Sequence, residues 1–200
     1  MPMQPASSRF FNSIVLPYNF DADAPYPGWQ DFLDQTLPRT EPGDRRQQLL
    51  QEFMGYSLTR DCRQEKMRIL TGEGRNGKST LLNVWESMLG RENVKHLPFT
   101  QLGGEFRLIE LDNALANFAS DLPHIGRTDE GIIKQLISGE PINANRKNKS
   151  PVEIRPFAKL VVACNTLPSF VDPSLGIWLH DRLSGASPAV GPNHAPQVVL

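Results

Sequence analysis

Hydrophobic residues follow two different patterns along the chain, and the change falls about a third of the way along it. In the first part, apolar positions recur at helical spacing and predict a short helix over residues 29–37, which Pro38 closes. A second helix has Asp44 as its expected N-cap and Gly55 at its expected end. Its apolar residues share one face: Leu49, Leu50, Phe53 and Met54. We therefore expect a small helical unit over residues 28–64.

After this unit, short apolar runs alternate with amphipathic segments. The runs at 67–71, 114–119 and 159–164 are strand candidates, and the last is apolar almost throughout, as buried parallel strands are. The segments at 79–89 and 129–138 have helical spacing. This alternation predicts an α/β fold with a parallel sheet.

Polar segments with several prolines lie at both ends. Residues 1–27 predict an extended arm or linker, and residues 184–200 predict a disordered tail. Residues 65–183 then form the core. Within the core, the extended segments 141–145 and 151–155 predict a hairpin.

The composition is that of an ordinary globular chain: 200 residues, 39% hydrophobic and 22% charged. A formal net charge of −1 excludes a uniformly basic nucleic-acid binder, so any such contact must be a local patch. The two cysteines, Cys62 and Cys164, provide no disulfide framework and fit a reducing compartment. No apolar run approaches 18 residues and no secretory signal is visible, so we expect a cytoplasmic protein without a membrane contact.

One motif carries chemistry. Residues 72–79 match the phosphate-loop pattern G-x-x-x-x-G-K-[ST] in full, between the first strand and the first helix expected in the core. Loop glycines let backbone N–H groups converge on phosphate oxygens, and the next helix adds the positive end of its dipole. Lys78 can neutralise the β- and γ-phosphates, and the Ser79 hydroxyl can bind Mg²⁺. A glycine-rich turn after any strand is the alternative, but the flanking strand and helix favour the phosphate loop. The predicted residues of this ATP site are Gly72, Glu73, Gly74, Arg75, Asn76, Gly77, Lys78, Ser79 and Thr80.

Two polar residues after later strands are candidates for the same site. Asp121 follows the second core strand, where a phosphate loop needs an acid to hold the water shell of the metal. A loop or cap aspartate is the alternative. Asn165 follows the third strand, where its amide could orient the attacking water or sense the γ-phosphate, although such an Asn is usually a turn residue. The predicted metal ligands are Ser79 and Asp121, and the predicted catalytic residues of the chain's own site are Lys78, Asp121 and Asn165.

The tip of the expected hairpin, residues 146–150, is basic. Arg146, Lys147 and Lys149 stand there with amide side chains between them, which suits contact with a phosphate backbone without reading of the sequence. A solvated charged turn is the alternative that composition alone allows. No aromatic residues alternate with these cations, so base stacking is not indicated.

Several sequence blocks occur in a recognisable order. They are LPY at 16–18, PGW at 27–29, LQE at 50–52, GY at 55–56, GEGRNGKS at 72–79, ASDLP at 119–123, KQLISGEPI at 134–142, KNK at 147–149 and NTLP at 165–168. In this order they resemble the C-terminal region of phage and plasmid primases of the P4 type. That region carries a superfamily 3 helicase of the AAA+ fold after a small helical domain of the D5 type.

The resemblance implies an ATP-dependent DNA helicase or translocase module of a primase-helicase in phage or plasmid replication, within a bacterial cytoplasm. It implies that Asp121 takes the Walker B position, where the family more often has Glu, and that Asn165 is the sensor. It also implies that the hairpin grips single-stranded or forked DNA inside a ring, a hexamer in the intact parent. A neighbour's arginine would complete each ATP site. Arg182 is the nearest candidate for this arginine finger, although His180 and Asp181 occupy the positions where arginine is commonest.

The same resemblance places an apolar strand, ending in Pro-Phe, after the arginine. Residues 184–188 here are Ser, Gly, Ala, Ser and Pro. We therefore expect the strand beside the phosphate-loop strand to be missing, which would leave an exposed edge in the scaffold of the site. A frameshifted or artificially ended reading frame would account for such a tail.

Two other functions stay open from the sequence. A truncated remnant would bind nucleotide or DNA without turnover. A P-loop kinase or another NTPase would use a small-molecule acceptor, and the ordered motifs after the phosphate loop argue against it.

Overall fold

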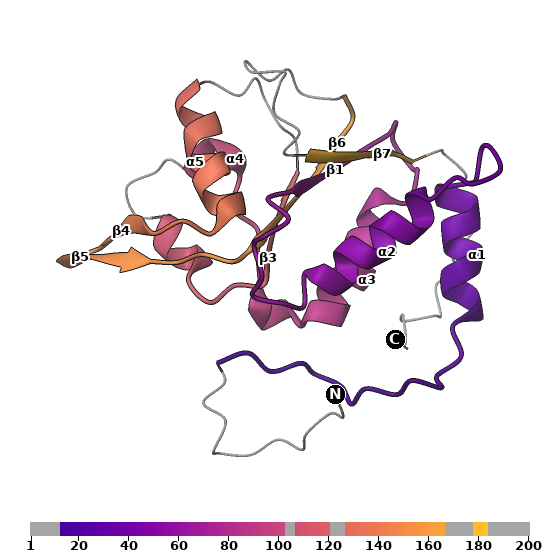
Figure 1. Cartoon of the computed structure of the whole chain (residues 1–200), viewed down its shortest axis with the longest axis horizontal. Helices are drawn as coiled ribbons and strands as arrows, with labels where there is room; N and C mark the ends of the chain where they lie inside the picture. Colours follow the sequence, from indigo (N-terminus) through magenta and orange to yellow (C-terminus); the bar gives the residue numbers. More distant parts are fainter. Residues whose placement is uncertain (1–12, 103–106, 121–126, 167–177, 184–200) are drawn as a thin grey trace.

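The computed structural model of the chain describes residues 13–102, 107–120, 127–166 and 178–183 (Figure 1). Its central strands are β1 (Met67–Thr71), β2 (Val94–Lys95), β3 (Ala116–Ser120), β6 (Lys159–Cys164) and β7 (Trp178–Arg182). They form one parallel sheet in the order β2–β3–β6–β1–β7. The prediction of an α/β fold with a parallel sheet is therefore confirmed, and two strands have the predicted bounds.

Helices cover both faces of this sheet (Figure 1). The α-helices are α1 (Pro27–Thr36), α2 (Arg46–Tyr56), α3 (Lys78–Leu89), α4 (Phe99–Leu102) and α5 (Arg127–Ser138), and the 3-10 helices are η1 (Arg91–Asn93) and η2 (Leu108–Leu111). Neighbouring residues of one strand face opposite layers: Ile69 packs on the side of α4 and α5, and Leu70 on the side of α1, α2 and α3. This two-sided burial explains why the strand carries apolar residues on both faces, Met67 and Ile69 on one and Leu70 on the other.

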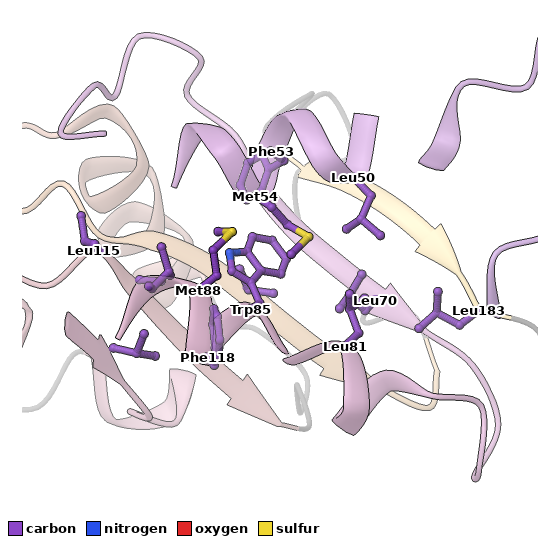
Figure 2. Close-up of a cluster of buried hydrophobic side chains, with 14 of the residues drawn as sticks. Leu50, Phe53, Met54, Leu70, Leu81, Trp85, Met88, Leu115, Phe118 and Leu183 are labelled. Atoms are coloured by element: carbon purple, nitrogen blue, oxygen red, sulfur yellow. The ribbon is translucent and has the colours of Figure 1, made fainter. Parts of the chain in front are cut away.

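The helices before residue 64 share one hydrophobic core with the sheet. Trp85 of α3 is fully buried at the centre of this cluster, as Figure 2 shows. Its ring meets Phe53 of α2 edge-on at 5.9 Å and Phe118 of β3 at 5.5 Å between centroids. Its indole N–H donates to the Ser57 hydroxyl at 2.8 Å. The helical unit is thus packed on the sheet, and its boundary at residues 28–64 stays a prediction.

Asp44 lies close to the position expected for it. The α2 helix begins at Arg46 and its N-cap position is Arg45, one residue after the expected cap. The Asp44 carboxylate nevertheless accepts the Arg46 backbone N–H at 3.0 Å and also the Arg46 guanidinium, which lowers the pKa of this carboxyl group. It therefore caps the first turn from outside the helix.

The described part of the arm, residues 13–26, has no helix or strand but lies against the core. Its side chains alternate, so that Ile14 and Leu16 pack on the core cluster while Val15 points to solvent. The Tyr18 hydroxyl donates to the Met88 carbonyl at 2.7 Å near the end of α3. Backbone and side-chain contacts therefore tie the arm to the C-terminal end of this helix.

We expect Tyr18→Phe to lower the free energy of unfolding by about 1 kcal/mol, because it leaves the Met88 carbonyl without this donor. Tyr26→Phe is the matched control, since Tyr26 is exposed, and it should stay within about 0.5 kcal/mol. Urea denaturation of the two variants measures the difference. Equal stabilities would show that the arm contact adds nothing.

The prediction of a missing strand beside β1 is wrong. β7 pairs in parallel with β1 along its whole length, from Met67 opposite Trp178 to Thr71 opposite Arg182. Its sequence, WLHDR, is too polar to resemble a buried strand. Within the described sheet β7 has a neighbour on one side only, and backbone pairing at such a position tolerates polar residues. The tail predicted for residues 184–200 lies outside the described residues.

The predicted hairpin is confirmed as a separate antiparallel pair, β4 (Ile142–Arg146) and β5 (Lys149–Ile154). Its root is buried through Ile142, Ala144 and Ile154. The four short elements β2, α4, η1 and η2 were not predicted. Among the described residues, no helix is long and apolar enough to cross a bilayer.

Candidate nucleotide-binding site and basic hairpin

The phosphate-loop motif connects the carboxyl end of β1 to the first turn of α3, between the ends of β6 and β7. Gly72 has φ +153°, and a Cβ atom there would lie 1.8 Å from Asn76 Nδ2 and 2.7 Å from the Leu183 carbonyl oxygen. Only glycine fits this position. The loop also places Arg75 at φ +64°, a conformation that non-glycine residues seldom adopt. The backbone thus turns back on itself as a phosphate loop requires.

The helical unit contacts this loop directly. A Cβ atom on Gly77, which has φ +85°, would lie 2.6 Å from Thr36 Cγ2 and 3.3 Å from Phe32 Cε2. Both side chains belong to α1, so the last turns of α1 lie against the turn that begins α3. The sequence carried no signal of this contact, because the two segments are distant in the chain and each pattern is explained locally.

The Lys78 ammonium lies over the loop and reaches the next strand. It donates to the Gly72 carbonyl oxygen, to Asn76 Oδ1 at 3.0 Å and to Asn165 Oδ1 at 3.5 Å. Asn165 follows β6, which pairs directly with β1. The structure therefore brings together Lys78 and Asn165, two of the residues selected from the sequence.

Asn76 provides a test of whether this loop fits a phosphate. The residue is 2% exposed, and among the described residues its Nδ2 atom has no hydrogen-bond partner. A buried N–H group without an acceptor costs about 1–3 kcal/mol. An anionic oxygen in the loop would provide that acceptor beside the Lys78 ammonium and the N-terminus of the 12-residue α3. The residues present therefore fit a bound phosphate.

A pocket of about 280 Å³ adjoins the loop. Ser79 at the start of α3 and Ser120 at the end of β3 both line it. The Glu86–His96 pair lines it too, with its closest oxygen and nitrogen 3.1 Å apart. Asp121, the predicted metal-binding acid, follows Ser120 but lies outside the described residues. Among the residues that the structure describes, no three His, Cys, Asp or Glu side chains gather as a metal site.

Arg182, the candidate arginine finger, is the last residue of β7. Its backbone lies opposite Thr71, directly before the phosphate loop of its own chain. The next residue, Leu183, donates its N–H to the Thr71 carbonyl at 2.8 Å. The side chain of Arg182 is not among those described, so its role stays a prediction.

The three hairpin cations lie together as predicted. Arg146 pairs with Lys149 across the hairpin, and Lys147 precedes Asn148 in the turn between them. Asn148 has φ +60°, a left-handed conformation that asparagine tolerates. All three cations are exposed. The Phe99–Leu102 and Arg127–Ser138 helices pack near the root of the hairpin, so the tip carries the charge away from the core.

A parallel sheet whose central strand leads through a phosphate loop into a helix is a P-loop NTPase-like fold. The solved structure of the NrS-1 C-terminal region, in its A form, has the same fold: it aligns with a TM-score of 0.64 and 18% identity over 84% of this chain and 40% of that one. The chain belongs to a family described as a family of unknown function, DUF5906, whose model matches residues 70–175.

Two curated viral proteins are similar in sequence. "Putative helicase 184R" of Invertebrate iridescent virus 6 is 26% identical in an alignment of 162 residues that covers 66% of this chain and 16% of that protein. "Putative helicase L207/L206" of Acanthamoeba polyphaga mimivirus is 24% identical in an alignment of 149 residues that covers 71% of this chain and 16% of that protein. The chain therefore spans about a sixth of the length of each relative.

Proposed function

We propose that this chain is the ATP-hydrolysing module of a DNA helicase or translocase, of the AAA+ superfamily 3 kind, in a replication primase-helicase of the P4 type. One observation carries the proposal: the Lys78 ammonium of a phosphate loop lies 3.5 Å from the Asn165 amide oxygen, at the carboxyl ends of two adjacent central strands. The viral relatives named as helicases and the fold shared with the NrS-1 C-terminal region support it.

Each residue of the loop has a role in this proposal. ATP phosphates bind on the backbone of residues 72–80, with Lys78 beside the β- and γ-phosphates and Asn76 donating its buried N–H. Ser79 and Asp121 hold Mg²⁺, which neutralises charge on the phosphate oxygens when bound. Asn165 orients the attacking water or senses the γ-phosphate. The chain thus contributes positioning and charge neutralisation, which dominate phosphoryl transfer.

The basic hairpin is the proposed DNA contact, and one strand connects it to the ATP site. After β5 the chain runs through residues 155–158 into β6, and β6 ends at Cys164, directly before Asn165. β6 lies between β1 and β3, so it is held on both sides. A force on the hairpin therefore reaches the sensor residue through six residues of buried strand.

The ring belongs to the proposal as well. ATP sites of this kind lie between subunits, and a hexamer would let Arg182 of one subunit act at the site of its neighbour. Such an arginine raises the rate of hydrolysis by orders of magnitude in P-loop NTPases that use one.

The test is ATP hydrolysis by the full chain, with and without single-stranded DNA. We expect hydrolysis that rises several-fold when DNA is added. Nucleotide binding without turnover, by a monomer, would instead identify a remnant that only binds. Transfer of phosphate to a small-molecule acceptor, with no effect of DNA, would identify a P-loop kinase.

We expect the double variant Lys147→Gln, Lys149→Gln to flatten the salt dependence of binding to single-stranded DNA, with a log–log slope shallower by about 1.4, because two phosphate contacts are lost. Fluorescence anisotropy across a salt series measures it. Arg91→Gln with Lys95→Gln removes the same charge from η1 and β2 and should leave the slope unchanged. Equal slopes for the two double variants would exclude the hairpin as the contact.

A further inference from the structure

A buried lysine joins residues 155–158, which connect the hairpin to β6, to the loop that follows α2. Lys159, the first residue of β6, is 4% exposed. Its ammonium donates to the Thr59 carbonyl at 3.0 Å and to the Phe157 carbonyl at 2.8 Å. It also lies 4.6 Å from the centroid of the Tyr56 ring. Three segments, the end of α2, the loop after it and the connection between β5 and β6, therefore meet at one charged group.

Other contacts close the same junction. The Arg60 guanidinium lies 5.0 Å from the centroid of the Phe157 ring. Cys62 Sγ lies 3.9 Å from the Pro156 carbonyl oxygen. A Cβ atom on Gly139, just after α5, would lie 2.9 Å from the same sulfur atom. Residues 56–62 are thus packed against residues 156–159 by side chains from both segments.

The charge at this junction is costly, and the cost indicates what the lysine does. Burial lowers the pKa of Lys159, because desolvation disfavours the ammonium. An apolar side chain of similar length would fill the space without that cost. An apolar side chain, however, could not donate hydrogen bonds to both carbonyls, and it would bring no cation to the aromatic face of Tyr56. The lysine therefore supplies orientation rather than burial.

We propose that Lys159 is a positioning residue: it fixes residues 155–158, which connect the hairpin to β6, so that a displacement at the hairpin tip is transmitted to Asn165. The part of this proposal that is measured by ATP hydrolysis rests on the proposed function. The geometry at the junction can be tested without that function.

The first test is hydrogen–deuterium exchange of the full chain with Lys159→Met. We expect amide exchange of residues 142–154 to rise at least about tenfold, while β1 and β3 keep their protection. Lys95→Met is the matched control, because Lys95 lies in β2, away from the junction, and it should leave the hairpin unchanged. Unchanged exchange of the hairpin in Lys159→Met would overturn the proposal, whether or not the chain hydrolyses ATP.

The second test separates coupling from folding. In Lys159→Met we expect basal ATP hydrolysis within twofold of the original chain, and the increase caused by single-stranded DNA to fall about tenfold. A purely structural lysine would lower both rates together, and that outcome would overturn the proposal. If the original chain hydrolyses no ATP, the proposed function fails and the exchange measurement alone decides.

A second pair of variants covers the case in which Lys159→Met does not fold. Tyr56→Leu removes the aromatic face and leaves the hydrogen bonds of the ammonium, so hairpin exchange should rise about threefold. Tyr56→Phe keeps the ring and loses only the hydroxyl that accepts the exposed Gln64 N–H at 3.3 Å, so its hairpin exchange should match that of the original chain. Identical exchange in Tyr56→Leu and Tyr56→Phe would contradict the proposed role of the junction.

Discussion

Replacement of Lys78 by alanine is expected to reduce ATP hydrolysis at least about 100-fold. In the proposed site the Lys78 ammonium neutralises the β- and γ-phosphates, and loss of a single charge-stabilising donor commonly costs two to three orders of magnitude in rate. A coupled-enzyme assay at saturating ATP measures the effect.

The control for this variant is Lys95→Ala, which removes a lysine in β2 and should keep the original rate. A thermal melt of Lys78→Ala should show a folded chain, because the lysine contacts loop carbonyls rather than the core. A folded Lys78→Ala that hydrolyses ATP at the original rate would exclude the phosphate loop as the site of hydrolysis.

Replacement of Gly72 by alanine is expected to lower the free energy of unfolding by about 3 kcal/mol and to abolish nucleotide binding. The added Cβ would meet the Asn76 amide at 1.8 Å and the Leu183 carbonyl oxygen at 2.7 Å, in a conformation that alanine rarely adopts. Either the loop or the end of β7 must move to admit it.

Gly74→Ala is the matched control, in the same loop, since a Cβ there meets nothing within 4 Å. It should retain the stability of the original chain within about 0.5 kcal/mol. Chemical denaturation and binding of a fluorescent ATP analogue compare the two variants. If both lose the same stability, the loss comes from the flexibility of glycine and not from the close approach of the backbone.

The sequence allowed the centre of the fold to be predicted because strong local patterns coincide with tertiary burial there. Residues 67–71 and 159–164 are mostly apolar, apart from Arg68 and Lys159, and both strands are buried between two helical layers. β7 could not be found this way. Its residues WLHDR show neither the hydrophobic spacing of a helix nor the alternation of a strand. Only its pairing with β1 makes it a strand. The two-residue strand β2 is too short to leave any pattern.

The candidate site likewise has some features that the sequence predicts and others that it does not. Lys78 and Asn165 could be placed together because the carboxyl ends of adjacent parallel strands meet at one edge of a sheet. The buried amide of Asn76 and the approach of Thr36 to Gly77 could not be predicted, since each depends on side-chain placement across the fold. Asp121 lies outside the described residues, and its role as a metal ligand stays a prediction.

The packing of α1 on Gly77 limits how the sequence of this region can change in evolution. A side chain larger than threonine at position 36 would clash with Gly77, because the turn into α3 holds Gly77 at φ +85°. Position 36 is therefore expected to hold a small side chain in homologous chains that keep Gly77. Recombination between residues 37 and 67 would join a helix to a loop with which it did not evolve. We therefore expect α1 and the phosphate loop to be inherited together, because exchange of one without the other would disturb their contact.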